Sequence, residues 1–529
     1  MNSAESTSTW GATLAGAALA FWLPGVLHAA QPPADADPEV TSRATHAQAD
    51  CAALSGQLVG NIVLSATTMP AKSDMPAYCR VTGTIAPSLN FEIRFPKIWN
   101  GKLYYGGGGG YNGFIPPPVA APLRQGYVEV ASDSGHQGDG MSAAFVLNDE
   151  LAARLFGSEA IPEVMSIALK VVAKAYGVPP VRSYFEGCST GGREGLMAVQ
   201  RNPALFDGVI ARAPAFNWAG FNGAFHRIAE ALSVPGAEFN AAKISLLARH
   251  VRQACDHLDG VIDGIVANPA ACTTRRVNLA ALRCSSGKDN GEHCLSDAQL
   301  AVVNQWITDV KFQGSNTYVA KGYHLTGNED DPMNFGVWVS GNGDLKAAGQ
   351  YVMQDTAVKY YLAKDESADS LAYGPWDKNP AALDAMAKLN DATDPDIRPF
   401  IGHGGKLIVW QGGADAALSV NSTIEYMKQM RQAVGAKNAE QSTRLYIAPG
   451  VNHCEGGVGP DHVDLLSALD HWISRGAEPG TLMAQKLDGG GKVLRALPLC
   501  RYPQYPRYTG PKHDAAAINA SSNYVCANP

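Results

Sequence analysis

One turn restricts the fold of this chain more than any other feature of its 529 residues. The sequence GCSTG at 187–191 is a G-x-S-x-G motif, and it lies between the apolar segment 181–187 and the helix-forming segment 193–200. Strand, sharp turn and helix in that order are typical of an α/β fold, in which the turn presents the hydroxyl of Ser189 at the end of a buried strand. An ordinary strand-to-helix turn is the alternative, because a chain with 55 glycines also produces such a motif by chance.

Apolar runs and amphipathic runs alternate on both sides of this turn. Further strands are predicted at 102–105, 127–132, 207–214, 406–415 and 443–450. Apolar residues at helical spacing predict helices at 163–176, 421–434 and 463–475. The alternation indicates a parallel sheet with crossover helices, formed by residues 31–215 and 397–529.

The stretch between these two parts, residues 216–396, differs in composition. It has many aromatic residues, Asn and Gly, four closely grouped cysteines and few strand patterns. We therefore expect a second domain that is inserted into the core.

The N-terminus and the cysteines indicate export. Residues 11–27 are apolar and precede Ala29-Ala30, which predicts a signal peptide over residues 1–30, with an apolar membrane anchor as the alternative. The sequence has no later apolar run of about 18 residues, so no membrane span is expected after signal removal. Ten cysteines, an even number, fit an oxidising compartment, and we expect a secreted or periplasmic protein.

The charge pattern argues against a nucleic-acid partner. The chain has 42 Lys and Arg against 49 Asp and Glu, a net charge of −7, and it has no basic stripe that could displace counterions from phosphates. A small-molecule substrate is the expected partner.

A serine nucleophile needs a base and a carboxylate that orients the base. In α/β-hydrolase folds these follow the serine in the order Asp or Glu, then His. Asp415 ends one predicted strand segment and His453 follows another, so both are expected at the carboxyl ends of parallel strands, where such sheets bind ligands. We predict Ser189 as nucleophile, Asp415 as orienting acid and His453 as base.

Four other histidines compete with this assignment: His136, His403, His462 and His471. His136 precedes the serine, which is the wrong order, and His462 and His471 lie beside the last predicted helix, where a solvated or capping role is expected.

The predicted nucleophile and base each have a cysteine as a neighbour. Cys188 precedes Ser189 and Cys454 follows His453, so a hydrogen-bonded serine and histidine would bring the two thiols near enough to bridge. Two unrelated buried thiols are the alternative.

Acyl transfer also needs donors for the oxyanion of the tetrahedral intermediate. One is expected from the backbone amide of Thr190, the residue after the nucleophile. The second is expected from the glycine run 106–110, because glycine lets the backbone approach a substrate closely. A flexible connector is the alternative for that run.

A second constellation is typical of a cation site. Asp256, Asp259 and Asp263 are spaced three and four residues apart, and Gly260 and Gly264 can bend the chain. Carbonyl oxygens of Val261 and Ile265 would complete the shell that Ca²⁺ requires. A polar surface turn is the alternative. No His or Cys set in the sequence has a convincing zinc spacing.

Four segments in one order resemble the tannase and feruloyl esterase family, which includes mono(2-hydroxyethyl) terephthalate hydrolases. They are GCSTGGREGLMAVQRNPALFDGVIARAPA at 187–215, CDHLDGVIDGIV at 255–266, GGADAALS at 412–419 and PGVNHCEGG at 449–457. The resemblance runs from about Cys51 to the C-terminal cysteines. It implies an α/β-hydrolase core with a large inserted lid domain at about 216–396, where the match is weakest.

The resemblance also implies roles for single residues. It places the oxyanion donors on the amides of Gly110 and Thr190, and the family's triad on Ser189, Asp415 and His453. It implies a structural Ca²⁺ held by Asp256, Asp259, Val261, Asp263 and Ile265. It further implies the disulfides Cys51–Cys79, Cys188–Cys454, Cys255–Cys272, Cys284–Cys294 and Cys500–Cys526.

The expected activity is hydrolysis of a small aromatic ester, such as a feruloyl or galloyl ester, through an acyl-enzyme on Ser189. A terephthalate monoester hydrolase is the alternative within the family. A peptidase or an acyltransferase on the same triad, or a binding protein that has lost catalysis, are alternatives in other classes.

Overall fold

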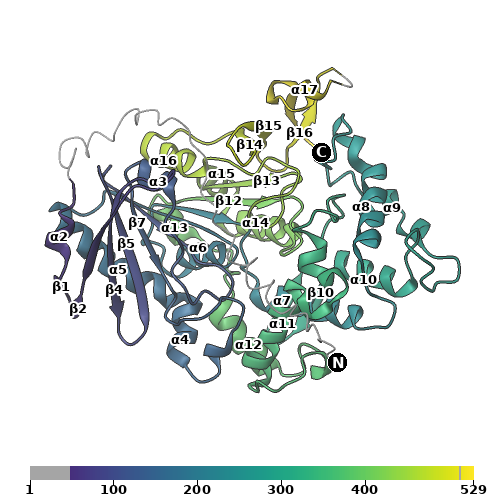
Figure 1. Ribbon diagram of the computed structural model, residues 1–529, viewed down its shortest axis with the longest axis horizontal. Helices are drawn as coiled ribbons and strands as arrows, with labels where there is room; N and C mark the ends of the chain where they lie inside the picture. The colour runs from purple at the N-terminus through teal and green to yellow at the C-terminus, as the bar shows by residue number, and fades with distance from the viewer. Residues whose placement is uncertain (1–47, 512–513) are drawn as a thin grey trace, which may run out of the picture.

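The structure is a computed structural model that describes residues 48–511 and 514–529 (Figure 1). The predicted signal peptide at 1–30 lies outside the described residues. Within the described ranges, no helix has both the length and the apolar character needed to cross a membrane.

A nine-stranded sheet forms the centre of the molecule, in the order β13-β12-β9-β8-β6-β7-β5-β4-β3. Six of its strands are parallel: β6 (Lys102–Gly106), β7 (Val128–Ser132), β8 (Arg182–Cys188), β9 (Gly208–Arg212), β12 (Lys406–Gly412) and β13 (Thr443–Ala448). These are the six strands that the alternation predicts, so the parallel sheet is confirmed. β12 ends earlier than predicted, at Gly412, which leaves Asp415 in the loop beyond it.

Helices cover both faces of the parallel strands, which explains why the strand sequences are apolar without a break. Val209 and Ala211 of β9 contribute to one core and Ile210 to the opposite one, as the two-residue period of a strand requires. The first core contains residues of α5 (Ala160–Tyr176), α6 (Thr190–Arg201) and α14 (Val420–Val434), and the second contains residues of α16 (Leu465–Arg475). The predicted helix at 193–200 was too short, because α6 begins directly after Ser189.

An antiparallel edge extends the sheet beyond β7 and was not predicted. It consists of β5 (Leu89–Pro96), β4 (Tyr78–Ile85) and β3 (Ser65–Met69), at the left of Figure 1. The disulfide Cys51–Cys79 ties the short helix α2 (Cys51–Leu54) to β4.

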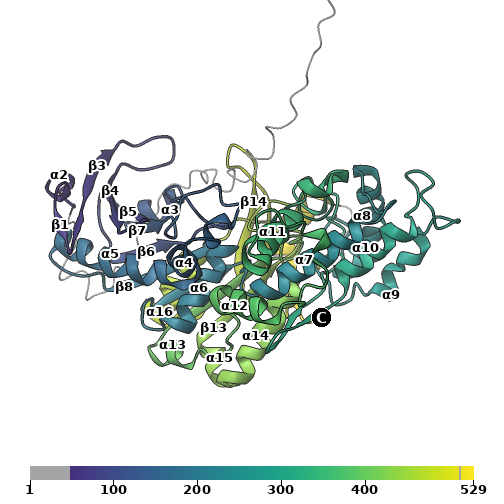
Figure 2. The same ribbon diagram turned by 90° about the horizontal axis from the view of Figure 1, so that it is seen from below.

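The chain between β9 and β12 forms a mainly helical body beside the sheet (Figure 2). Its longer helices are α7 (Trp218–Leu232), α8 (Ala241–Cys255), α10 (Asp297–Ile307), α11 (Gly349–Ala357) and α12 (Pro380–Asn390), and it has one hairpin of β10 (Val310–Gln313) and β11 (Thr317–Ala320). The chain enters and leaves this body at neighbouring points, since the amide of Ala392 donates to the carbonyl of Phe216 at 2.8 Å. Its apolar core also includes Tyr111 and Ala416 from the sheet side, so the predicted domain limits at 216 and 396 stay a prediction.

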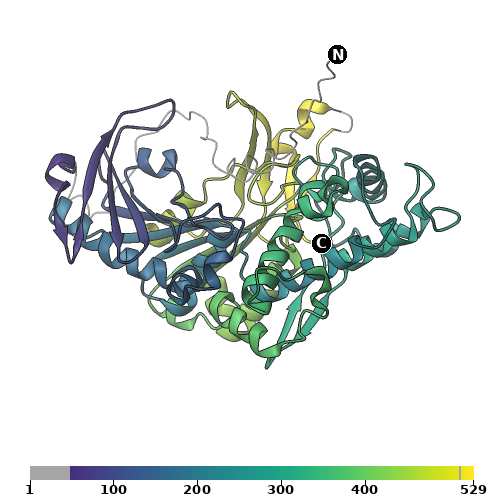
Figure 3. The ribbon, with the colours of Figure 1, turned by 60° about the horizontal axis from the view of Figure 1, so that its bottom comes forward.

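Two C-terminal hairpins, yellow in Figure 3, join the sheet to the helical body. They are β14 (Leu482–Leu487) with β15 (Val493–Leu499), and β16 (Tyr505–Tyr508) with β17 (Tyr524–Ala527). Tyr502 donates its amide to the carbonyl of Leu445 in β13 at 2.9 Å, and Arg495 forms an ion pair with Asp263 of the helical body at 3.1 Å. The disulfide Cys500–Cys526 links the residue that follows β15 to β17.

Candidate active site

Ser189 occupies the turn between β8 and α6 with backbone angles of φ 61° and ψ −119°. A positive φ is uncommon outside glycine and persists only where the surroundings hold the residue. Here the Ser189 amide donates to the carbonyl of Arg212 at 3.0 Å, and the Ser189 carbonyl accepts from the amides of Arg193 at 3.0 Å and Ala215 at 2.9 Å. These are the features of a nucleophile elbow, in which the strained turn exposes the hydroxyl at the sheet edge.

His453 and Asp415 form a buried pair at the same edge of the sheet. Nδ1 of His453 lies 2.9 Å from Oδ2 of Asp415. Because Nδ1 faces a carboxylate it carries the proton, which leaves Nε2 as the basic nitrogen. The carboxylate is itself fixed, since Oδ1 accepts the amides of Ala417 and Leu418 at 2.9 Å each and Oδ2 accepts Nε2 of Gln411 at 3.0 Å.

A disulfide joins the serine turn to the histidine loop. Cys188 and Cys454, the neighbours of Ser189 and His453, are bonded with their α-carbons 5.9 Å apart, across 266 residues of sequence. The bridge anticipated from these two neighbours is therefore present. All five pairings that the family resemblance implies are present as well, and no cysteine in the described residues is free.

The competing histidines have other partners. His462 pairs with Asp461 at 2.9 Å, and His136 stacks on Phe145 with ring centroids 3.6 Å apart. Burial lowers the pKa of His136, which keeps its ring neutral. His403 follows the short helix α13 (Arg398–Gly402), and His471 lies within α16. The structure thus joins only His453, of these five, to Asp415.

The two residues whose amides are predicted to bind an oxyanion, Gly110 and Thr190, are in contact. The hydroxyl of Thr190 donates to the carbonyl of Gly110 at 2.5 Å, so the residue after the nucleophile contacts the glycine run directly. Gly110 has φ 57°, and a β-carbon there would lie 2.2 Å from the carbonyl oxygen of Gly140, so the position requires glycine. Neither the Gly110 amide nor the Thr190 amide donates to an acceptor among the described residues. This is what an oxyanion hole requires, because its donors must be available to the substrate.

Three carboxylates of the predicted calcium loop are buried. Asp256 and Asp259 are 4% and 2% exposed, and the side chain of Asp263 is 3% exposed. Burial and the nearby charge of Asp263 raise the pKa of Asp259 to about 8, and burial also raises the pKa values of Asp256 and Asp263. Buried carboxylates that repel one another are the donor chemistry that suits a hard cation.

The same three carboxylates accept hydrogen bonds from nearby backbone amides. Asp256 accepts the amides of Asp263 and Gly264, Asp259 accepts those of Val261 and Ala267, and Asp263 accepts that of Ile265. In these positions, no three acidic, His or Cys side chains of the described residues converge on one point as a metal site. The five predicted ligands therefore lie in one loop, bracketed by Cys255–Cys272, without forming a closed coordination shell.

Several residues of the helical body contact the loops that carry Asp415 and His453, and sequence reasoning missed them; Trp338, Asn334 and Asp331 are three of these. The ring of Trp338 stands at 79° to that of His453 with centroids 5.3 Å apart. Nδ2 of Asn334 donates to the carbonyl of Ala414 at 2.6 Å and to Oδ1 of Asn452 at 2.7 Å, and Asp331 accepts Nδ2 of Asn452 at 2.7 Å. No motif surrounds these residues, so nothing in the local sequence marks them.

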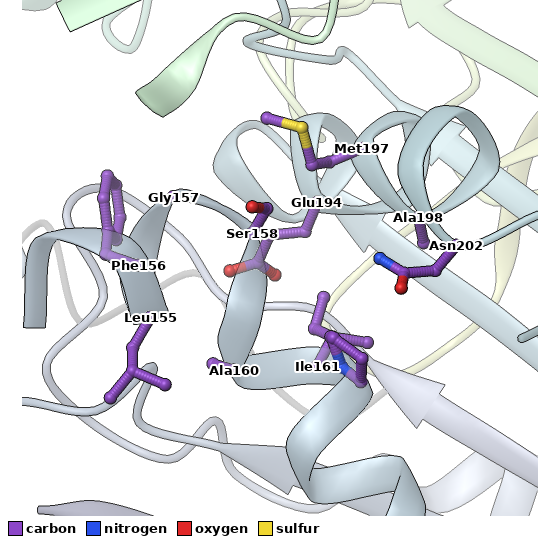
Figure 4. A pocket seen from close by; sticks show the side chains of 11 residues that line it. Leu155, Phe156, Gly157, Ser158, Ala160, Ile161, Glu194, Met197, Ala198 and Asn202 are labelled. Atoms are coloured by element: carbon purple, nitrogen blue, oxygen red, sulfur yellow. The ribbon is translucent and has the colours of Figure 1, made fainter. Parts of the chain in front are cut away.

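A small pocket lies behind the nucleophile helix, between α6 and the helical turn at Leu155–Glu159 (Figure 4). Its lining is mostly apolar, with Glu194 and Asn202 from the α6 side. It has room for about one water molecule, so it cannot hold an aromatic ester.

The chain is similar in sequence to known esterases. A sequence model of the family described as "Tannase and feruloyl esterase" matches residues 73–527. The mono(2-hydroxyethyl) terephthalate hydrolase of Piscinibacter sakaiensis is 31% identical over 527 residues, with 86% of this chain and 85% of that protein covered. Feruloyl esterase B of Aspergillus niger is 27% identical over 458 residues, with 82% and 84% covered.

Solved structures share the fold. Feruloyl esterase B from Aspergillus oryzae superposes with a TM-score of 0.78 at 23% identity, covering 89% of this chain and 98% of that one. Tannin acyl hydrolase from Aspergillus niger superposes with a TM-score of 0.71 at 23% identity, covering 90% and 94%. The chain therefore has the α/β-hydrolase fold, as the strand–turn–helix order predicted.

Proposed function

Because the chain belongs to the tannase and feruloyl esterase family of carboxylic-ester hydrolases, we propose that it cleaves esters of aromatic acids with Ser189 as its nucleophile. The observation that carries this proposal is the disulfide Cys188–Cys454, which tethers the strained serine turn to the buried His453–Asp415 pair. A serine, an imidazole oriented by a carboxylate and two backbone amides without an acceptor in the described residues are the groups that acyl transfer requires.

The mechanism follows from these positions. Nε2 of His453 takes the proton of the Ser189 hydroxyl as the oxygen attacks the ester carbonyl, and Asp415 stabilises the imidazolium that forms. The amides of Gly110 and Thr190 donate to the oxyanion. Collapse breaks the ester bond, and His453 returns the proton to the leaving alcohol. A water molecule, deprotonated by His453, then attacks the acyl-enzyme and releases the acid with Ser189 restored.

Two observations support an aromatic acyl group. Relatives covering most of this chain are named for feruloyl and terephthalate esters. The half-buried ring of Trp338 also lies beside His453, where it offers a flat apolar surface at the reacting atoms. We place feruloyl and galloyl esters first. A terephthalate monoester is the second candidate, favoured by the 31% identity to the hydrolase of Piscinibacter sakaiensis.

The test is chromatographic detection of the acid released from methyl ferulate, methyl gallate and mono(2-hydroxyethyl) terephthalate. Release by the native protein and none by Ser189→Ala is the expected result, and the substrate with the highest kcat/KM names the acyl class. Equal release by a folded Ser189→Ala variant would refute the assignment of the nucleophile. An amide analogue and an added alcohol acceptor, assayed in parallel, distinguish a peptidase or an acyltransferase on the same triad.

We also propose a structural calcium ion at the loop 256–265. Side-chain oxygens of Asp256, Asp259 and Asp263 and carbonyls of Val261 and Ile265 would hold it. The support is the burial of three carboxylates in ten residues, which raises their pKa values, since a divalent cation would offset the cost of burying their charge. The ion would join α8 to the C-terminal hairpins, because Asp256 follows that helix and Asp263 contacts Arg495.

We further propose export through the predicted signal peptide to the periplasm or the medium. Five disulfides support this proposal, because bonds of this kind form and persist in oxidising compartments.

A further inference from the structure

The glycine run at 106–110 is attached to the nucleophile helix by one side chain. Glu194 lies on α6, five residues after Ser189, and is 6% exposed. Its Oε2 accepts the amide of Gly108 at 2.9 Å, and its Oε1 accepts Nδ2 of Asn112 at 2.5 Å. The two residues that Glu194 contacts flank Gly110 on either side, so a single carboxylate spans the turn that carries one of the proposed oxyanion donors.

Backbone packing leaves this turn little room to move toward the helix. A β-carbon added at Gly191 would lie 2.7 Å from the carbonyl oxygen of Gly108, and one added at Gly107 would lie 2.8 Å from the α-carbon of Gly191. The run and the first turn of α6 are therefore in direct backbone contact. Contact of this kind resists approach but does not prevent withdrawal, so attractive bonds must hold the turn against the helix.

The bonds that do so come from α6 and from the segment after β7. Two of these bonds are those that Gly108 and Asn112 donate to Glu194. Asn112 is also hydrogen bonded to the hydroxyl of Ser134, which follows β7. On the other side of the turn, the hydroxyl of Thr190 donates to the carbonyl of Gly110.

The neighbouring Arg193 does not take this carboxylate as its hydrogen-bond partner. Its guanidinium donates to the carbonyls of Phe156 at 2.8 Å and Gly157 at 2.9 Å. The Glu194 carboxylate is thus directed at the glycine turn.

On the basis of the proposed serine mechanism, we propose that Glu194 is a positioning residue that sets the distance of the Gly110 amide from Ser189. The nucleophile and both oxyanion donors then form one unit, because Ser189, Thr190 and Glu194 belong to the same elbow and helix. A carboxylate fits this role, since it offers two acceptors and both of its partners are donors. A side chain that only stabilises the fold would make the same contacts. Kinetic measurements distinguish such a stabilising role from a positioning role.

The test compares three variants with the native protein. Glu194→Met keeps the length of the side chain and removes both acceptors, while Glu194→Gln keeps one acceptor oxygen. Asn112→Gly removes the second link without backbone strain, because Asn112 has φ 51°, which glycine adopts freely. Glu129→Gln is the matched control: Glu129 is a carboxylate in β7, 1% exposed, that bonds Arg94 and the amide of Val119 away from the glycine run.

Three quantities are measured for each folded variant: kcat and KM on 4-nitrophenyl acetate, and the inhibition constant of phenylboronic acid, whose tetrahedral serine adduct places an oxygen at the oxyanion position. Misplacing a group by about 1 Å can lower the rate about 100-fold. We expect kcat to fall roughly 100-fold in Glu194→Met and roughly 10-fold in Asn112→Gly, with KM changed less than about threefold. Glu194→Gln should recover part of kcat, and the affinity for phenylboronic acid should fall in the same order.

The inference is overturned if folded Glu194→Met keeps a kcat within twofold of the native value, or if Glu129→Gln loses as much kcat as Glu194→Gln. It is overturned equally if kcat falls while the affinity for phenylboronic acid is unchanged. If Glu194→Met does not fold, Asn112→Gly decides by the same criteria. If the native protein has no esterase activity, the proposed function is refuted. If the native protein is active, Ser189→Ala is inactive and Asn112→Gly keeps the native kcat, only the positioning role of Glu194 is refuted.

Discussion

Removal of the Cys188–Cys454 disulfide should lower both the stability of the protein and its turnover. The bond spans 266 residues, and in the chain-entropy model a loop of that length stabilises the folded state by about 5.5 kcal/mol at 25 °C. Domains are typically stable by about 5–15 kcal/mol, so the double variant Cys188→Ala/Cys454→Ala should lose a large part of its free energy of unfolding.

A second disulfide of the same protein provides the control. Cys284–Cys294 spans 10 residues, for which the same model gives about 2.7 kcal/mol, and it lies in the helical body away from His453. Cys284→Ala/Cys294→Ala should therefore lose about 3 kcal/mol less than the first variant. Urea unfolding followed by tryptophan fluorescence measures both losses on equal terms.

Turnover distinguishes the two bonds further. Only the first bond connects the nucleophile turn to the base, so only its removal should lower kcat, by roughly 10- to 100-fold if His453 shifts by about 1 Å. Assays without denaturant on the folded fraction measure this effect. Equal losses of unfolding free energy in the two double variants would refute the loop-length reasoning. A folded Cys188→Ala/Cys454→Ala variant with native kcat would refute the positioning of the base by the disulfide.

Three further changes have defined outcomes. Asp415→Asn should lower kcat about 10⁴-fold with little change in KM, because an amide no longer holds the proton on Nδ1 of His453; steady-state kinetics measure it, and a loss under tenfold contradicts the triad. Chelation with EGTA should lower the melting temperature, and added CaCl₂ should restore it in the native protein but not in Asp259→Asn; a melting temperature indifferent to both reagents contradicts the calcium proposal. Burial raises the pKa of Glu129 to about 6, so the folded state binds the proton of this carboxyl more tightly than the unfolded state does. The stability that the bound proton contributes is therefore lost as pH rises from about 4 to about 6. Urea midpoints across that range should therefore fall less in Glu129→Gln than in the native protein, and parallel pH profiles would contradict this.

The proposed active site could be located from the sequence to the extent that its parts are local. Ser189 sits in a turn whose glycines and flanking elements are contiguous in sequence, and Asp415 and His453 each follow an apolar strand. In a parallel sheet the carboxyl ends of the strands share one edge, so strand order alone brings these residues near one another. The adjacent cysteines then became informative, because residues next to two neighbouring side chains must themselves be close.

The parts that escaped prediction depend on contacts between distant segments. The antiparallel strands β3 and β4 have mixed polar and apolar residues. They join the sheet only through β5, whose pairing with β7 links segments that β6 and α3 separate along the chain. Trp338 reaches His453 across more than a hundred residues of sequence, with no periodicity to mark it.

The sequence by itself determined the class of fold, the order of the proposed catalytic residues and the turn that contains Ser189, because hydrophobic periodicity and turn chemistry act over a few residues. Only the tertiary structure decided which side chain holds the glycine run, which residues of the helical body border the base, and how the three carboxylates at 256–263 are arranged. A buried carboxylate such as Glu194 takes whichever donors the packed chain brings within about 3 Å, and that choice is made by the assembly of α6 against the glycine run rather than by either segment alone.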